Sequence, residues 1–296
     1  MSRHDVLIGV VHLVICLPTF ILTLIVSLTI HLSTNLSQLL SYKILLQLNF
    51  SYLLHTAVHI GVGITILAGD DDIDSIEKVL GAFADLGWFA IMFVNFLLCL
   101  ERFNVTFFKS PFTLTKTTFM ITSLLAWLPG MVFFFFDLTP YVTFYYSAVN
   151  AQWDFTGPLT DGIVKVSQIL TFTILPLTFL IYLTIYVNLA KKRGIYSNQS
   201  QQKITVELKF LFAVTITFLY QCAEEVLYFI FHTVGEDRFS TRLAIHIMWI
   251  ALPLFCQIVQ LLLTRSLRRN IVSLFVKAVE KKTLVVSLKN TSRNTN

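Results

Sequence analysis

Seven polar side chains lie inside long apolar stretches of the sequence, where each needs a partner or contact with water. They are His55, His59, Asp85, Gln221, Glu224, Glu225 and His246. An ionisable group near the centre of a membrane helix costs about 2.5 kcal/mol or more, so it pairs with another group or lines a water-filled cavity. These residue types therefore favour one of two roles: recognition of a polar or cationic ligand, or pairing between helices.

A ligand pocket would combine polar groups from this set with aromatic side chains as its apolar walls. The predicted pocket residues are His59, Asp85, Trp88, Gln221, Glu224, Glu225, Tyr228, His246 and Trp249. Adjacent helical residues point about 100° apart, so we expect only one of Glu224 and Glu225 to face the interior. The structural alternative pairs one of these glutamates with His59 or His246 across helices.

The histidines also allow an enzymatic interpretation. His55 and His59 are four residues apart and, with Asp85 and His246, could bind zinc in a membrane-embedded hydrolase. The last apolar block, however, contains one histidine where a pair would be expected. We therefore predict no catalytic residue, no metal and no cofactor.

A transporter or channel is the other alternative class, because membrane carboxylates also relay ions. Secondary carriers usually have paired repeats and broken helices. This sequence shows no internal repeat, and it contains only 11 glycines to break its helices.

Composition defines the elements that must hold these residues. Apolar residues make up 55% of the chain and charged residues 13%, against about 25% charged in a soluble domain. Seven blocks are long enough to span a bilayer, near residues 6–32, 39–67, 79–100, 117–136, 162–189, 207–232 and 241–264. We predict an all-α membrane protein, a bundle of seven transmembrane helices.

The distribution of Lys and Arg predicts the orientation of this bundle. Seventeen of these residues fall on one side and five on the other, and the richer side is normally cytoplasmic. The amino terminus is then extracellular and the carboxyl terminus cytoplasmic. The expected location is the plasma membrane, with the ciliary membrane as one candidate. Topology accounts for the basic charge, so nucleic acid is not expected as a partner.

An amphipathic helix is predicted after the last span, at about residues 265–279. Leu267, Ile271 and Leu274 have helical spacing, while Arg268 and Arg269 fall on other faces, as in a helix that lies on membrane lipid. Residues 1–282 would form one domain, and the polar residues 283–296 a disordered tail.

Short motifs resemble those of the G-protein-coupled receptors. Glu101-Arg102-Phe103 ends the third block as the acidic-Arg-aromatic motif of those receptors does, and Pro253 lies in the seventh. Tyr42-Lys43-Ile44, Gln202-Lys203-Ile204 and Trp249 are similar to motifs of the nematode serpentine chemoreceptors, in their class T or class X branch. The likeness covers roughly residues 6 to 270.

The resemblance implies a receptor for a small environmental or signalling molecule that acts through a heterotrimeric G protein. The implied coupling residues are Glu101, Arg102, Phe103, Lys191, Lys192, Arg193 and Lys203. Arg102 would be paired at rest and released when helices separate. The alternative for the basic residues is that they only set topology and contact anionic lipid.

The cysteines depart from the rhodopsin-type pattern. Cys16, Cys99, Cys222 and Cys256 all lie in apolar blocks, so no disulfide can fix the loop over residues 137–161. Either packing of its aromatic residues holds this loop, or the loop is mobile.

Overall fold

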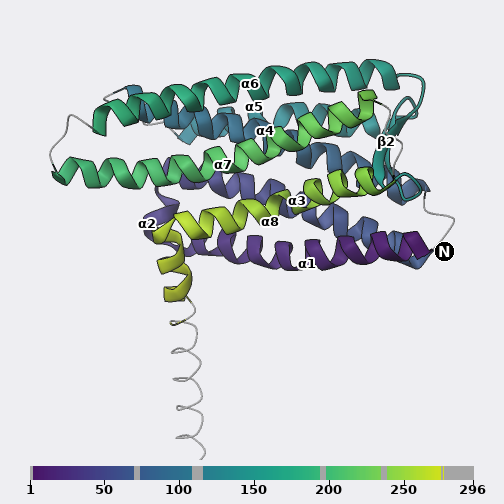
Figure 1. Ribbon diagram of the computed structural model, residues 1–296, viewed down its shortest axis with the longest axis horizontal. Helices are drawn as coiled ribbons and strands as arrows, with labels where there is room; N and C mark the ends of the chain where they lie inside the picture. The colour runs from purple at the N-terminus through teal and green to yellow at the C-terminus, as the bar shows by residue number, and fades with distance from the viewer. Residues whose placement is uncertain are drawn as a thin grey trace, which may run out of the picture.

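The computed structural model is a bundle of seven long helices lying side by side (Figure 1). It describes residues 3–69, 74–108, 116–193, 198–234, 239–274 and 276. The helices are α1 (Arg3–Leu32), α3 (Leu40–Ala68), α4 (Asp74–Phe107), α5 (Lys116–Asp137), α6 (Thr160–Arg193), α7 (Asn198–Val234) and α8 (Phe239–Leu263). Each is long and apolar enough to cross a membrane, so the predicted seven-span integral membrane protein is confirmed.

The bundle has two ends that differ in the small elements they carry. The amino-terminal face holds the start of α1 together with strands β1 (Thr143–Ser147) and β2 (Gln152–Thr156) (Figure 1). The opposite face holds α2 (Thr34–Ser37) and a short helix over residues 265–274, which turns away from the bundle axis after α8 (Figure 1).

Two of the predicted loops are shorter than expected. The prediction that the third span ends at residue 100 is wrong, because α4 continues to Phe107. Its last turns carry Glu101, Arg102 and Phe103. Helix α6 likewise extends to Arg193, past the predicted end of its span at residue 189. Neither extension contains Gly or Pro, so the backbone continues as a helix beyond the apolar block.

Helix α4 lies at the centre of the bundle. It packs against α3, α5, α6 and β1. In its most apolar 18-residue stretch 72% of the residues are buried, the highest share among the seven spans. Its inward side chains, including Phe89, Ile91 and Leu98, are fully enclosed by the other helices. Side chains along α4 are therefore placed to contact several other helices.

The loop over residues 137–161 contains an antiparallel hairpin that the sequence analysis did not anticipate. Strands β1 and β2 pair Tyr145 with Asp154 and Tyr146 with Trp153. Phe144, Tyr146 and Trp153 are buried against the bundle. All four cysteines are free, as predicted. Aromatic packing therefore holds this loop where a disulfide is missing.

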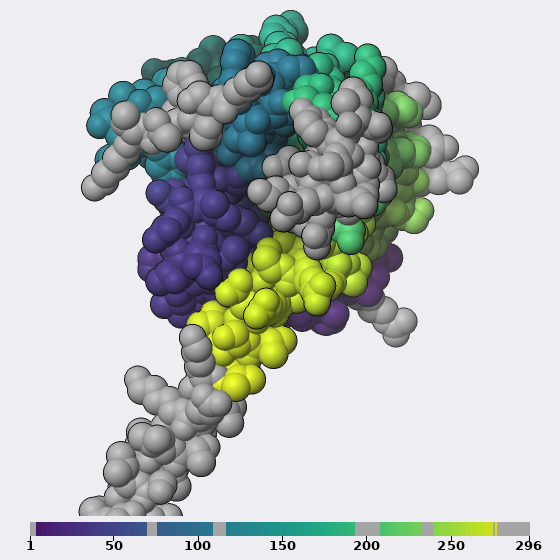
Figure 2. All heavy atoms as spheres, turned by 90° about the vertical axis from the view of Figure 1, so that its left-hand side faces the viewer, coloured from purple at the N-terminus to yellow at the C-terminus, as the bar shows by residue number. Residues whose placement is uncertain are grey.

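The short helix after the last span is confirmed. Leu267 is fully buried, the Tyr42 hydroxyl lies 2.9 Å from that of Ser266, and the Ser33 hydroxyl donates to Asn270 at 3.2 Å. Figure 2 shows this segment in yellow, beside the purple amino-terminal helices at the opposite face. The remainder of the predicted amphipathic helix, to residue 279, and the predicted disordered tail 283–296 lie outside the described residues, apart from residue 276.

Gly81 allows the hairpin to approach α4. A Cβ atom at Gly81 would fall 1.6 Å from the Phe144 carbonyl oxygen, whereas one at Gly162 would meet nothing within 4 Å. We predict that Gly81→Ala destabilises the protein by about 1–3 kcal/mol because the hairpin must move. Thermal unfolding in detergent should show a lower Tm than for Gly162→Ala, the matched control. Equal Tm values for the two variants would contradict this close packing.

Candidate ligand pocket and opposite-face ion pair

A cavity of about 660 Å³ opens at the amino-terminal face, between α4, α6, α7, α8 and the hairpin. Seven of the nine predicted pocket residues line it: Asp85, Trp88, Glu224, Glu225, Tyr228, His246 and Trp249. His59 and Gln221 do not. Aromatic and acidic residues that are far apart in the sequence thus line one cavity. Its volume is in the range of small-molecule sites.

The carboxylates are the most demanding groups in this cavity. Asp85 and Glu224 are 5% and 4% exposed, and each has one carboxylate oxygen without a hydrogen-bond partner. Glu225 also lines the cavity, so the expectation that only one glutamate faces the interior is wrong. Glu224 is buried and Glu225 is partly buried, and both line the cavity from adjacent positions on α7. Buried carboxylate oxygens without partners favour a ligand that brings a positive charge or hydrogen-bond donors.

Three tryptophans form the apolar wall. The Trp249 ring lies 5.9 Å from that of Trp88 and 5.9 Å from that of Trp153, both edge to face. Trp153 comes from β2, and its role in the pocket was missed because the loop was not predicted as a hairpin. The available sequence signal for a strand was the run of β-branched and aromatic residues over 143–146.

Helix α6 contributes a second set of residues that sequence reasoning missed. Its lining residues are Thr160, Asp161, Val164, Lys165, Ser167, Gln168, Thr171 and Phe172, and Arg242 of α8 joins them. Most are polar or small residues within an apolar span, and they carry no motif. Only the fold shows that this side of α6 faces a cavity.

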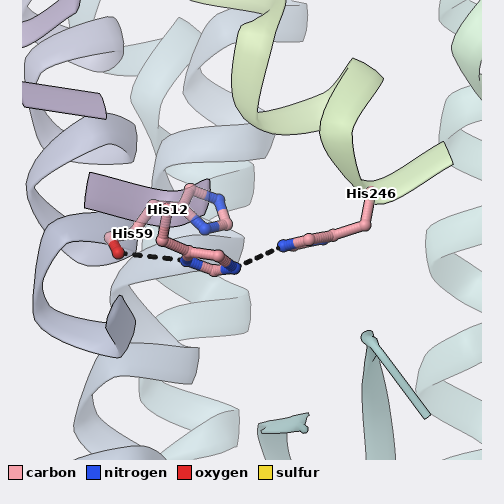
Figure 3. A group of neighbouring side chains, drawn as sticks. All are labelled: His12, His59 and His246. Carbon is pink, nitrogen blue, oxygen red and sulfur yellow. Dashed lines mark hydrogen bonds between the residues drawn. The ribbon is translucent and has the colours of Figure 1, made fainter. Parts of the chain in front are cut away.

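His59 belongs to a cluster behind the cavity wall. It is fully buried in α3, and its ring lies 4.5 Å from that of His55 and 5.3 Å from that of His12. His246 Nε2 lies 2.8 Å from His12 Nε2 (Figure 3). The predicted glutamate–histidine pair is therefore not found among these described residues. The partner of His246 is His12, which the sequence analysis did not select.

Gln221 takes part in a polar layer deeper in the bundle. The Asn95 amide donates to Gln221 Oε1 at 3.3 Å, linking α4 to α7. The Gln257 amide donates to Asn49 Oδ1 at 2.8 Å, linking α8 to α3. These bonds are of the interhelical kind that the structural alternative predicted for the polar residues.

Glu101 and Arg102 form a buried ion pair at the opposite face. Arg102 Nε donates to Glu101 Oε2 at 2.6 Å, and the Ser41 hydroxyl of α3 donates to Glu101 Oε1 at 3.0 Å. The Arg102 guanidinium also lies 5.0 Å from the ring centre of Phe210 in α7. We call these four residues the arginine clasp, since it joins α3, α4 and α7.

Of the other predicted coupling residues, only some are described near the arginine clasp. Phe103 stacks on Phe107 at 4.5 Å, and Lys192 donates to the Thr106 carbonyl at 2.9 Å, which ties α6 to α4. Lys191 is exposed. The side chains of Arg193 and Lys203 lie outside the described residues.

Comparison with known proteins identifies the fold. No protein family and no curated protein matches the sequence. The crystal structure of squid rhodopsin is similar, with a TM-score of 0.72 and 13% sequence identity. The alignment covers 94% of this chain and 90% of that one. The protein therefore has the seven-helix fold of squid rhodopsin over nearly its whole length.

The cavity should admit water-soluble reagents from the amino-terminal face. In a Cys222→Ser background, we predict that Ser167→Cys, which lines the cavity, reacts with a cationic thiol reagent faster than Thr173→Cys. Thr173 is exposed on the same helix but does not line the cavity, and a thiolate is disfavoured in lipid. The measurement is the labelling rate in intact membranes. Equal rates would mean that the cavity is closed to solvent.

Proposed function

We propose that this protein is a receptor for a small cationic molecule that binds in the cavity at the amino-terminal face. The observation that carries the proposal is the pair of buried carboxylates, Asp85 and Glu224, each with an unpartnered oxygen in a cavity walled by tryptophans. A fold shared with squid rhodopsin supports the assignment of this space as a ligand site.

The charges around the cavity favour a cation over an anion. The lining acids are Asp85, Asp154, Asp161, Glu224 and Glu225, and of these Asp154 already accepts hydrogen bonds from Asn150 and Gln152. Lys165 and Arg242 are the basic lining residues. Trp88 and Trp249 line the same cavity, and a protonated amine over the face of either ring would gain about 0.5–2 kcal/mol of cation–π attraction.

The arginine clasp is our candidate for the output of the receptor. The ion pair lies within α4, whereas the Phe210 contact joins Arg102 to α7, so movement of α7 away from α4 would break that contact and expose Arg102. The resemblance of Glu101-Arg102-Phe103 to receptor motifs implies a heterotrimeric G protein as the partner. The excess of Lys and Arg at this face supports a cytoplasmic location for it.

The proposed receptor family rests on the sequence motifs alone. We propose a chemosensory receptor of the nematode serpentine kind, in the plasma membrane with its amino terminus outside. Under this proposal Lys191, Lys192, Arg193 and Lys203 contact the G protein or anionic lipid from the ends of α6 and α7.

Removing the charge of Glu224 should weaken cation binding. For a protonated amine that stabilises the purified protein in a screen of amines and neutral isosteres, Glu224→Gln should raise the Kd at least about tenfold, since a charged hydrogen bond contributes about 1.5–3 kcal/mol. Glu77→Gln, on α4 but outside the lining, is the control and should keep the affinity. Stabilisation by neutral isosteres alone would contradict a cationic ligand.

The arginine clasp should control signalling without controlling ligand affinity. In cells with a G-protein readout, Arg102→Ala should abolish the response to the same amine, while Glu101→Gln should raise the ligand-free signal because it weakens the ion pair. Arg269→Ala, an exposed residue of the short helix, is the control. A response that survives both Arg102→Ala and a block of G-protein signalling would refute this coupling.

A further inference from the structure

We propose that His12, His59 and His246 form a zinc-binding site between α1, α3 and α8. One ring nitrogen from each residue lies within 4.8 Å of the others, and all three side chains are buried (Figure 3). Imidazole nitrogen is a preferred zinc ligand, and three histidines are the protein ligands of several open zinc sites. This inference goes beyond the proposed receptor function and does not depend on it.

The orientation of His12 suits a metal ligand. Its Nδ1 lies 3.1 Å from the His59 carbonyl oxygen, so Nδ1–H donates there and Nε2 carries a lone pair, which accepts from His246 Nε2–H when no metal is bound. That lone pair points toward His246 (Figure 3). Zinc-binding histidines commonly donate their second ring N–H to a carbonyl or carboxylate in this way, which fixes the tautomer.

The distances require only small movements. With Zn–N bonds of about 2.0–2.1 Å, two nitrogens of a tetrahedral site are about 3.3 Å apart. His12 Nε2 and His246 Nε2 are 2.8 Å apart, so these two atoms must separate by a few tenths of an ångström. The ligand nitrogen of His59 lies within 4.8 Å of the other two ligand nitrogens and must move closer to them. A rotation of the His59 side chain can supply this movement.

His59 itself has an unsatisfied requirement that a metal would meet. Its side chain is fully buried, and neither of its ring nitrogens has a hydrogen-bond partner. The neighbouring His55 is in the same condition. A buried polar group without a partner is costly, so coordination of the His59 ring would remove that cost.

The site has both a route of entry and a candidate fourth ligand. His246 lines the ligand cavity, so an ion can reach the cluster from the amino-terminal face. The Tyr146 ring lies 4.8 Å from that of His246 and 5.2 Å from that of His12, and its buried hydroxyl has no hydrogen-bond partner. A zinc-bound water from the cavity or the Tyr146 oxygen would complete the tetrahedron.

Bound zinc would regulate the cavity through Trp249. The His59 ring lies 5.1 Å from that of Trp249, and His246 is one helical turn before it in α8. A metal that ties α8 to α1 and α3 would therefore fix this wall of the ligand cavity. Zinc and ligand are then expected to change each other's affinity.

The test is zinc binding by the purified full chain, prepared with an affinity tag that contains no histidine. We expect one Zn²⁺ per molecule by calorimetry, a rise in Tm with zinc that a chelator reverses, and the visible absorption of a tetrahedral site with Co²⁺. His12→Gln and His246→Gln should each weaken zinc binding at least about tenfold. His31→Gln is the matched control, since His31 is an exposed residue of the same helix α1.

Wild-type protein that shows no stoichiometric zinc and no change in Tm would overturn the proposal, whatever the variants do. Zinc binding that His12→Gln and His246→Gln leave unchanged would overturn it too, since the metal would then be held elsewhere. If a variant does not fold, the Co²⁺ spectrum of the wild type still decides, because nitrogen coordination gives bands that a site of oxygens alone does not. These outcomes decide the zinc site whether or not the cavity binds an amine.

Discussion

Lipid around the bundle offers no hydrogen bonds, and this constraint orders the rest of the structure. Leu124, Phe135 and Ile169 are each more than 60% exposed on the outside, while the polar side chains are turned inward. The inward groups fall into three layers along α4: Asp85 at the cavity, Asn95 in the middle, and Glu101 at the opposite face. The middle layer links α4 to α7 and the layer at the opposite face links it to α3 and α7, so α4 reaches both the cavity and the arginine clasp.

Helix α7 is the other element that reaches both ends of this arrangement. It supplies Glu224 to the cavity and Phe210 to the arginine clasp, and between them Gln221 accepts a bond from Asn95. Asp85 and Arg102 are about 25 Å apart along α4, too far for direct contact. A ligand that bridges the carboxylates of α4 and α7 can therefore act on the clasp only by shifting one of these helices against the other.

The sequence was sufficient for the features that depend on composition and periodicity. Seven spans, the short helix around Leu267 and seven of the 24 cavity-lining residues follow from long apolar blocks and the polar and aromatic groups within them. It was insufficient where partners are distant in the chain. His12 appeared to be an isolated histidine in an apolar block, and only the contact between α1 and α8 brings it to His246, 234 residues away. Trp153 required a hairpin whose register no local signal specified.

The position of α1 explains why a histidine cluster matters to a cavity that α1 does not line. Helix α1 packs on α3 and α8, and His12 contacts residues of both. The cavity wall formed by Trp249 is therefore supported from behind by His12 and His59, which do not line the cavity. The His59 ring nitrogens have no hydrogen-bond partner, so this support is incomplete in the absence of a further bound group. Whatever satisfies the histidines will also determine how firmly α8, and with it the ligand cavity, is held.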